Sequence, residues 1–175
     1  MWIMGKRSPR AVSQGDVEIL ATLLIAFPQI SRIVFDPKRR TLTLVFLCKG
    51  PIGKAQQRRI NKLYRESIEV YHSLCGIESR CVSCSWDLTG ELSSFQVERD
   101  VVSLSTGELS LTTSLISQST SVFSAFDDST LGEEPELSLS ARFFVQELLE
   151  DIKNLECARQ LVAVREGERV LVFDK

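Results

Sequence analysis

Few residues of this chain could take part in catalysis, and they do not form a recognisable set. The 175-residue sequence contains one histidine, His72, so any histidine-based proton relay must use it. His72 follows Tyr71 of a periodic apolar stripe, and we expect it at the surface or boundary of a helix. The chain has no Gly-x-Ser-x-Gly motif, which marks one common type of serine nucleophile. We therefore expect no catalytic residues, and an enzyme of unassignable type is our third choice among the function classes.

Four residues of the types that bind zinc lie within a short stretch: His72 and Cys75, then Cys81 and Cys84. Each pair has a spacing found in zinc sites. However, the residues between Cys81 and Cys84 favour an extended chain, in which positions three apart point to opposite faces. We therefore expect free thiols, no metal and no cofactor, with zinc binding by these four residues as the alternative. Five cysteines, an odd and small number, favour a reducing compartment and predict a cytoplasmic protein.

Charge is distributed unevenly along the chain. Residues 1–65 carry thirteen Lys or Arg against three acids, a net charge of +10, whereas residues 66–175 carry −12. Within an expected helix, four basic residues advance by three or four positions, and a fifth lies beside them. We call this set the basic stripe: Lys54, Arg58, Arg59, Lys62 and Arg65. Such a stripe is the electrostatic footprint of a protein that binds nucleic acid or another polyanion.

The opposing interpretation is that the acidic second half neutralises the basic stripe, within the chain or across an oligomer. Exposed ion pairs stabilise by only about 0–1 kcal/mol each, but several together could bias docking. The acids around the third expected helix would be the partners: Glu133, Glu134, Glu136, Glu147, Glu150 and Asp151. Both interpretations stay open here, because the sequence does not say whether the stripe is exposed or covered.

Apolar periodicity predicts the elements that position these residues. Residues 16–27, residues 54–75 and a segment that begins near residue 137 have helical spacing, with Asp16 as the first N-cap. Alternating or β-branched runs separated by turn residues predict strands. The expected strands cover residues 30–35, 41–48, 80–86, 91–98, 101–105, 108–115, 160–165 and 169–173.

The fold class that follows is α+β, with a largely antiparallel sheet and three helices in the order αββα, strand meander, αββ. The two ends suggest an αββ pseudo-repeat, in which Ile33-Val34-Phe35 aligns with Val162-Ala163-Val164. We expect a flexible arm at residues 1–15, a single domain over residues 16–175, and a mobile Ser/Thr-rich loop near residues 117–136. The order of elements is similar to that of the roadblock-like interaction domains. The similarity is one of element order alone, and no residue motif accompanies it.

Composition limits the function classes. With 43% hydrophobic and 25% charged residues, the chain is neither fibrous nor wholly disordered, and it has no apolar run of about 18 residues that could span a membrane. The lack of a catalytic set and the expected strand edges favour a non-enzymatic interaction or regulatory module that self-associates or binds another protein. Nucleic-acid binding through the basic stripe is the alternative.

Overall fold

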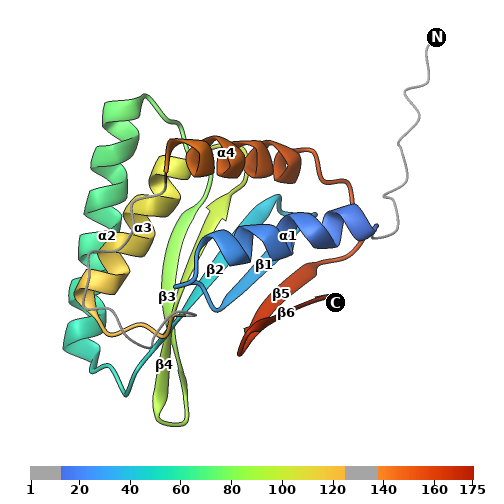
Figure 1. Cartoon of the computed structure of the whole chain (residues 1–175). Helices are drawn as coiled ribbons and strands as arrows, with labels where there is room; N and C mark the ends of the chain where they lie inside the picture. The colour runs from blue at the N-terminus through green and yellow to red at the C-terminus, as the bar shows by residue number, and fades with distance from the viewer. Residues whose placement is uncertain (1–12, 125–137) are drawn as a thin grey trace.

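The computed structural model describes residues 13–124 and 138–175, in which the chain forms four helices and six strands (Figure 1). The helices are α1 (Gln14–Ala26), α2 (Lys54–Cys75), α3 (Thr106–Ser119) and α4 (Leu139–Lys153). The strands are β1 (Arg32–Asp36), β2 (Thr41–Cys48), β3 (Val82–Thr89), β4 (Leu92–Asp100), β5 (Leu161–Glu166) and β6 (Arg169–Asp174). The mixed α+β class predicted from the sequence is confirmed.

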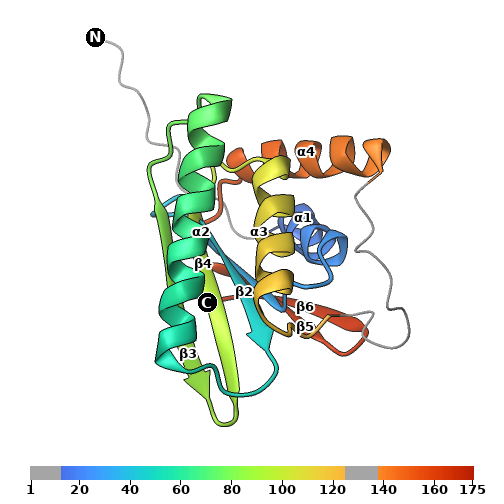
Figure 2. The ribbon, with the colours of Figure 1, turned by 90° about the vertical axis from the view of Figure 1, so that its left-hand side faces the viewer.

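All six strands join one antiparallel sheet in the order β3-β4-β2-β1-β5-β6. β1 and β5 are far apart in the sequence but pair near the middle of the sheet, where Ile33 lies opposite Ala163. β3 and β6 are the two edge strands. The four helices cover one face of this twisted sheet (Figure 2), and we call the other side the open face.

The hydrophobic core lies between the sheet and the helices. Alternate strand residues such as Phe35, Leu44 and Val97 are buried against apolar side chains from all four helices. The helices contact one another in the order α2, α3, α4, α1. α2 and α3 lie side by side, and α4 runs across the end of α3 (Figure 2). Burial of one large apolar side chain contributes about 1.5–3 kcal/mol, so this layer is the main source of stability.

Local signals fix the helix ends. The predicted second helix is confirmed as α2, which ends at Gly76 in a left-handed conformation (φ 64°) that suits a residue without a Cβ. The first helix begins earlier than predicted, because Ser13 is its N-cap. Asp16, the predicted N-cap, instead accepts a hydrogen bond from the Ser13 backbone N–H (2.9 Å). The two residues form a reciprocal capping box.

The prediction of strands over residues 101–105 and 108–115 is wrong, because most of this segment forms α3. Ser105 caps this helix by accepting a hydrogen bond from the Glu108 backbone N–H (3.2 Å). Leucines and small polar residues alternate from Leu109 to Thr112, as they would in a strand with one wet face. In α3, however, small polar residues such as Thr112 and Thr113 are buried. The Ser-x-x-Glu sequence at residues 105–108 was the signal for a helix start. The chain therefore has four helices instead of three, and no strand meander in this region.

Part of the predicted Ser/Thr-rich loop is also corrected. Residues 117–119 belong to α3, and Val122 forms an isolated antiparallel bridge with Cys48. Residues 125–137, the remainder of the predicted loop and its C-terminal flank, lie outside the described residues, as does most of the predicted N-terminal arm, residues 1–12.

The elements α1, β1 and β2 follow one another in the same order as α4, β5 and β6. The two hairpins adjoin through β1 and β5. The residue alignment proposed between them is wrong. Ile33 projects into the core, as Ala163 opposite it does, whereas its predicted counterpart Val162 follows the alternation to the open face. The order of elements therefore recurs without a matching arrangement of side chains.

Candidate functional site

The basic stripe lies on the solvent side of α2, at the outer flank of the molecule (Figure 2). All five of its side chains are exposed, whereas Ile60 and Tyr64 of the same helix are buried in the core. Lys62 lies 3.7 Å from the carboxylate of Glu66, and both side chains are exposed. This is the one ion pair of the stripe among the described residues.

The acids expected to neutralise the stripe do not do so where the structure describes them. Glu150 pairs with Lys153 of its own helix (2.7 Å), and Glu147 and Asp151 form no ion pair with the stripe. Their helix, α4, packs against α1 and α3. The other three predicted partners, Glu133, Glu134 and Glu136, lie outside the described residues.

The first residue of the stripe, Lys54, is unfavourably placed for the helix itself. The partial positive charge of a helix N-terminus favours acids and disfavours cations, by about 0.3–1 kcal/mol per charge. In α2 only Lys54 of the stripe lies in the first turn, where this effect acts, and that turn has no acid. Gly53 at the N-cap provides no side-chain hydrogen bond. The start of α2 is therefore stabilised neither by a cap nor by an acid, and it carries a cation instead.

His72 is buried, contrary to the prediction of a surface or boundary position. It is 8% exposed, and its Nε2 lies 2.7 Å from Oε2 of Glu108, a wholly buried residue of α3. Thirty-six residues separate the two in the sequence. They meet only because α2 and α3 pack side by side, which no local pattern shows.

Arg99 of β4 extends this contact into a buried polar cluster, which we define as His72, Arg99, Asp100 and Glu108. The Arg99 guanidinium donates to both carboxylate oxygens of Glu108 and to Asp100 (2.7 Å). Arg99 and Glu108 are 1% and 0% exposed, so a substrate cannot reach either side chain. Their opposite charges pair with each other. The cluster therefore serves to join β4 to α2 and α3. The alternation of β4, which sends Phe95 inward, was the sequence signal that Arg99 is inside.

Asp100 holds the chain around the end of β4. Its carboxylate accepts hydrogen bonds from the backbone N–H groups of Arg80, Cys81 and Ser103, each at 3.0 Å. Burial alone would raise the pKa of Asp100, but the hydrogen bonds from Ser103, Cys81 and Arg99 outweigh burial and hold this pKa well below its usual range.

The four residues considered for zinc are not brought together. Cys84 Sγ lies 3.6 Å from Asn61, Cys81 Sγ lies 3.9 Å from the backbone carbonyl of Glu98, and His72 belongs to the polar cluster. Cys75 is exposed at the end of α2, and all five cysteines are free thiols. Within residues 13–124 and 138–175, no group of three or more His, Cys, Asp or Glu side chains could hold a metal ion.

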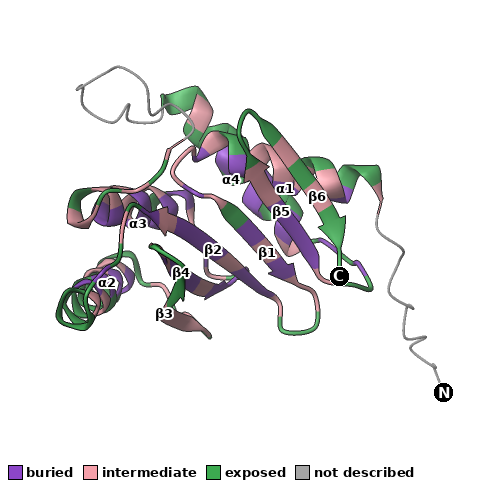
Figure 3. Cartoon of the chain, turned by 90° about the horizontal axis from the view of Figure 1, so that it is seen from below, coloured by how far each residue is buried: buried purple, intermediate pink, exposed green. Residues whose placement is uncertain are grey.

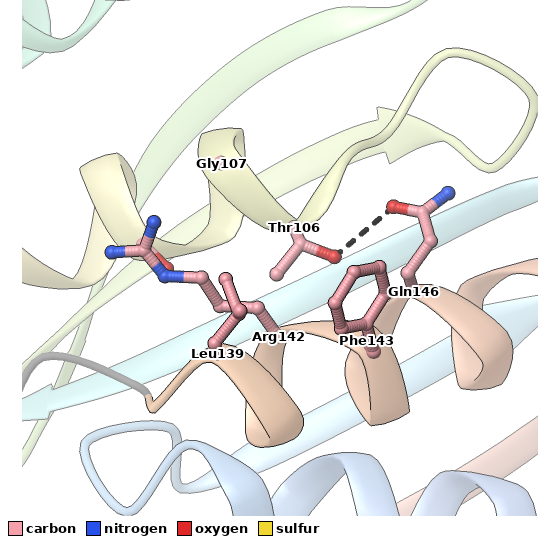
Figure 4. A pocket seen from close by; sticks show the side chains of 7 residues that line it. Thr106, Gly107, Leu139, Arg142, Phe143 and Gln146 are labelled. Atoms are coloured by element: carbon pink, nitrogen blue, oxygen red, sulfur yellow. Dashed lines mark hydrogen bonds between the residues drawn. The ribbon is translucent and has the colours of Figure 1, made fainter.

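A pocket of about 390 Å³ lies between the first turn of α3 and one side of α4 (Figure 4). Leu139 and Phe143 of α4 line it and are 72% and 67% exposed. On the opposite wall, Thr106 donates a hydrogen bond to Gln146 (3.3 Å). The largely apolar lining does not specify a ligand.

The edge strand β6 presents a second exposed surface. Its Val170 and Val172 pack against the core, whereas Leu171 and Phe173 project to the open face and are 46% and 49% exposed. β6 is bonded to β5 on one side and ends the described sheet on the other (Figure 3). The opposite edge strand, β3, has polar residues on the open face: Ser83, Ser85 and Asp87.

No protein-family model, curated protein or solved structure matches this chain. No helix in the described part of the chain is long and apolar enough to cross a membrane. The structure of the chain itself therefore provides the candidate sites. They are the free edge at β6 and the basic stripe on α2.

Proposed function

We propose that this protein is a non-enzymatic interaction module that self-associates through the edge of its sheet at β6. The observation that supports this proposal is the combination of a free strand edge with two half-exposed apolar side chains, Leu171 and Phe173. A free edge carries unpaired N–H and C=O groups that can form hydrogen bonds with another strand. The apolar side chains add a favourable burial term of about 25 cal/mol per Å².

The central four residues of β6 lack the features that usually keep edge strands from pairing, and the charged residues Arg169 and Asp174 stand at the two ends of the strand. Natural edges carry Pro, Lys, a bulge or a covering element. The four residues Val170-Leu171-Val172-Phe173 include none of these residue types and pair with β5 in an uninterrupted register. Of the two edges, β6 is therefore the more apolar and the better suited to pairing.

Sedimentation equilibrium tests the proposal. The test uses protein at about 100 μM, a concentration at which a dimer with a Kd on the order of 10 μM is mostly associated. We expect a species of about twice the 19.7 kDa chain mass. A single 19.7 kDa species at every concentration up to that value would contradict self-association.

A second candidate function is binding of a polyanion, such as nucleic acid, along α2. The observation that favours it is the exposure of all five residues of the basic stripe on one helix. Four of the five cations form no ion pair among the described residues, and the Lys62–Glu66 pair is exposed, so the stripe is available for phosphate groups.

Three substitutions in the stripe test this candidate. The ligands are fluorescent DNA and RNA, single- or double-stranded, at 50 mM salt. The triple variant, Arg58→Gln with Lys62→Gln and Arg65→Gln, should lose binding to them. If some binding remains, the slope of the logarithm of the association constant against the logarithm of salt concentration should fall by roughly 2–3. Stability should change by less than about 0.5 kcal/mol per site, since the three are exposed. Glu66→Gln with Glu69→Gln is the matched control on the same helix and should strengthen binding. Wild-type protein that binds none of these ligands at 50 mM salt would contradict the candidate.

A further inference from the structure

We infer that the partner of β6 is a second copy of this chain, paired antiparallel about a two-fold axis that passes through Leu171. The two six-stranded sheets would then continue into each other. This inference rests on the proposed self-association and names the strand and the register that produce it.

Alternate residues of β6 have backbone groups free at the edge. The Lys175 N–H donates to the Gln160 carbonyl (2.9 Å), which marks these two as a hydrogen-bonded pair in the β5–β6 ladder. Hydrogen-bonded and non-hydrogen-bonded pairs alternate along an antiparallel ladder. The other odd-numbered residues of β6 therefore bond to β5, and residues 170, 172 and 174 direct their N–H and C=O groups outward.

Two-fold symmetry restricts the register of a β6–β6 pair. In a continuous sheet, two residues directly opposite each other project from the same face. The alternation of β6 therefore requires odd-numbered residues to lie opposite odd-numbered ones, and even opposite even. Two registers meet this condition and retain most of the strand: one places Leu171 opposite itself, and the other places Val172 opposite itself.

The register centred on Leu171 brings compatible side chains together from Arg169 to Phe173, and its one unfavourable pair is Asp174 opposite Glu168, a residue of the turn before β6. Leu171 meets Leu171 on the open face, and Val170 meets Val172 on the core side. Arg169, which is exposed, meets the half-exposed ring of Phe173. A guanidinium over an aromatic ring is attracted to it, and apolar cross-strand pairs also stabilise a sheet.

The register centred on Val172 is less compatible. It places Arg169 opposite Lys175 and Val170 opposite Asp174. Like charges directly opposite each other destabilise an antiparallel pair, but each register has one such pair with a residue just outside β6. Within β6 itself, only the register centred on Val172 places a carboxylate, Asp174, opposite an apolar side chain, Val170. The register centred on Leu171 is therefore the one that the strand itself favours.

The charge at position 173 tests this register, because Arg169 of the second copy would lie opposite it. Phe173→Glu should retain the dimer, since two ion pairs replace two cation–aromatic pairs. Phe173→Lys should raise the dimer Kd at least about tenfold at low salt, since two like-charge pairs form. Arg169→Glu combined with Phe173→Lys should restore the dimer. Sedimentation equilibrium measures all four proteins, with circular dichroism as the check on folding.

The outcomes separate this inference from the proposed function. A wild-type monomer at about 100 μM would overturn both. A wild-type dimer that Phe173→Glu and Phe173→Lys weaken equally would overturn the register and leave self-association standing.

Two further variants test the strand itself. Val172→Pro removes an N–H group that faces outward, so it should dissociate the dimer without removing a β5–β6 hydrogen bond. Leu88→Lys, on the exposed part of the other edge strand, is the matched control and should leave the dimer intact. Dissociation by Leu88→Lys but not by Val172→Pro would place the interface at β3 and overturn the inference.

Discussion

At the scale of single residues, the polar cluster is the least expected feature of this protein. Arg99 is among the largest fully buried side chains, and its one positive charge faces the two carboxylates of Glu108 and Asp100. A buried ion pair is weak evidence for net stabilisation, because removing the charges from water costs several kcal/mol. Loss of one partner is costly nevertheless, since it leaves an uncompensated charge inside the fold.

Asp100 makes this cluster sensitive to acid. Its pKa is lowered in the folded protein, so its contribution to stability is complete above the unfolded pKa of about 4 and is lost as pH falls from there toward the folded pKa. Urea denaturation at a series of pH values should show the free energy of unfolding falling below about pH 4. Asp100→Asn should be less stable at pH 7 and should have a flatter profile between pH 4 and pH 2.

The matched control for this prediction is Asp87→Asn, because Asp87 is exposed on the edge strand β3. It should keep the pH profile of the wild-type protein. An unchanged acid profile in Asp100→Asn would show that Asp100 is not the group responsible.

At the scale of elements, α3 depends on its contact with α2. Gly107 lies in the first turn of α3, and a Cβ at this position would overlap the hydroxyl of Tyr71 on α2. That hydroxyl is hydrogen-bonded to Ser105, the N-cap of α3 (3.0 Å). The small residue therefore allows α2 and α3 to approach closely at the end where the polar cluster lies.

Gly107→Ala should therefore fail to give the stabilisation of about 1 kcal/mol that alanine usually brings to a helix. The reason is that the new methyl group displaces the Tyr71 hydroxyl. In a Tyr71→Phe background that hydroxyl is absent and the nearest remaining ring atom is 3.3 Å away. Thermal unfolding should show that Gly107→Ala is more favourable in the Tyr71→Phe background than in the wild-type protein. Equal effects in both backgrounds would contradict this account.

At the scale of the whole molecule, two arginines connect the N-terminal and C-terminal αββ units. Arg40, between β1 and β2, donates to the backbone carbonyls of Leu155 (2.7 Å) and Lys153 at the end of α4. Arg165 of β5 donates to the carbonyl of Leu24 near the end of α1. Each unit thus satisfies carbonyl groups at the helix end of the other, where the helix dipole also favours a cation.

Arg40→Met should lower the free energy of unfolding by about 1.5–3 kcal/mol, the range for hydrogen bonds with a charged partner. Arg165→Met should lower it by less, because the Nε of Arg165 is buried without a hydrogen-bond partner among the described residues and burial lowers the pKa of its guanidinium. Methionine retains much of the apolar stem, so the loss reports the guanidinium contacts. Arg159→Met is the control, because its ion pair with Asp174 is exposed and should contribute no more than about 1 kcal/mol. Chemical denaturation measures all three, and a loss at Arg40 no larger than that at Arg159 would contradict the clamping role.

The sequence alone determined the features that depend on neighbours along the chain. The apolar spacing and Gly76 defined α2. Alternation and turn residues predicted the hairpins β1–β2, β3–β4 and β5–β6, which are the three hairpins of the described sheet. The basic stripe could also be predicted, because residues three and four apart share a helix face whatever the rest of the chain does.

Only the tertiary structure decided the features that depend on contacts between distant segments. α3 alternates like a strand, and what makes it a helix is the burial of its small polar residues together with a cap at Ser105. His72 is inside because Glu108 and Arg99 reach it from α3 and β4. β6 became an edge because β5 pairs with β1, a choice made between strands more than a hundred residues apart. Burial and strand order are properties of the packed molecule, since they are set by the free energy of contacts that local sequence does not encode.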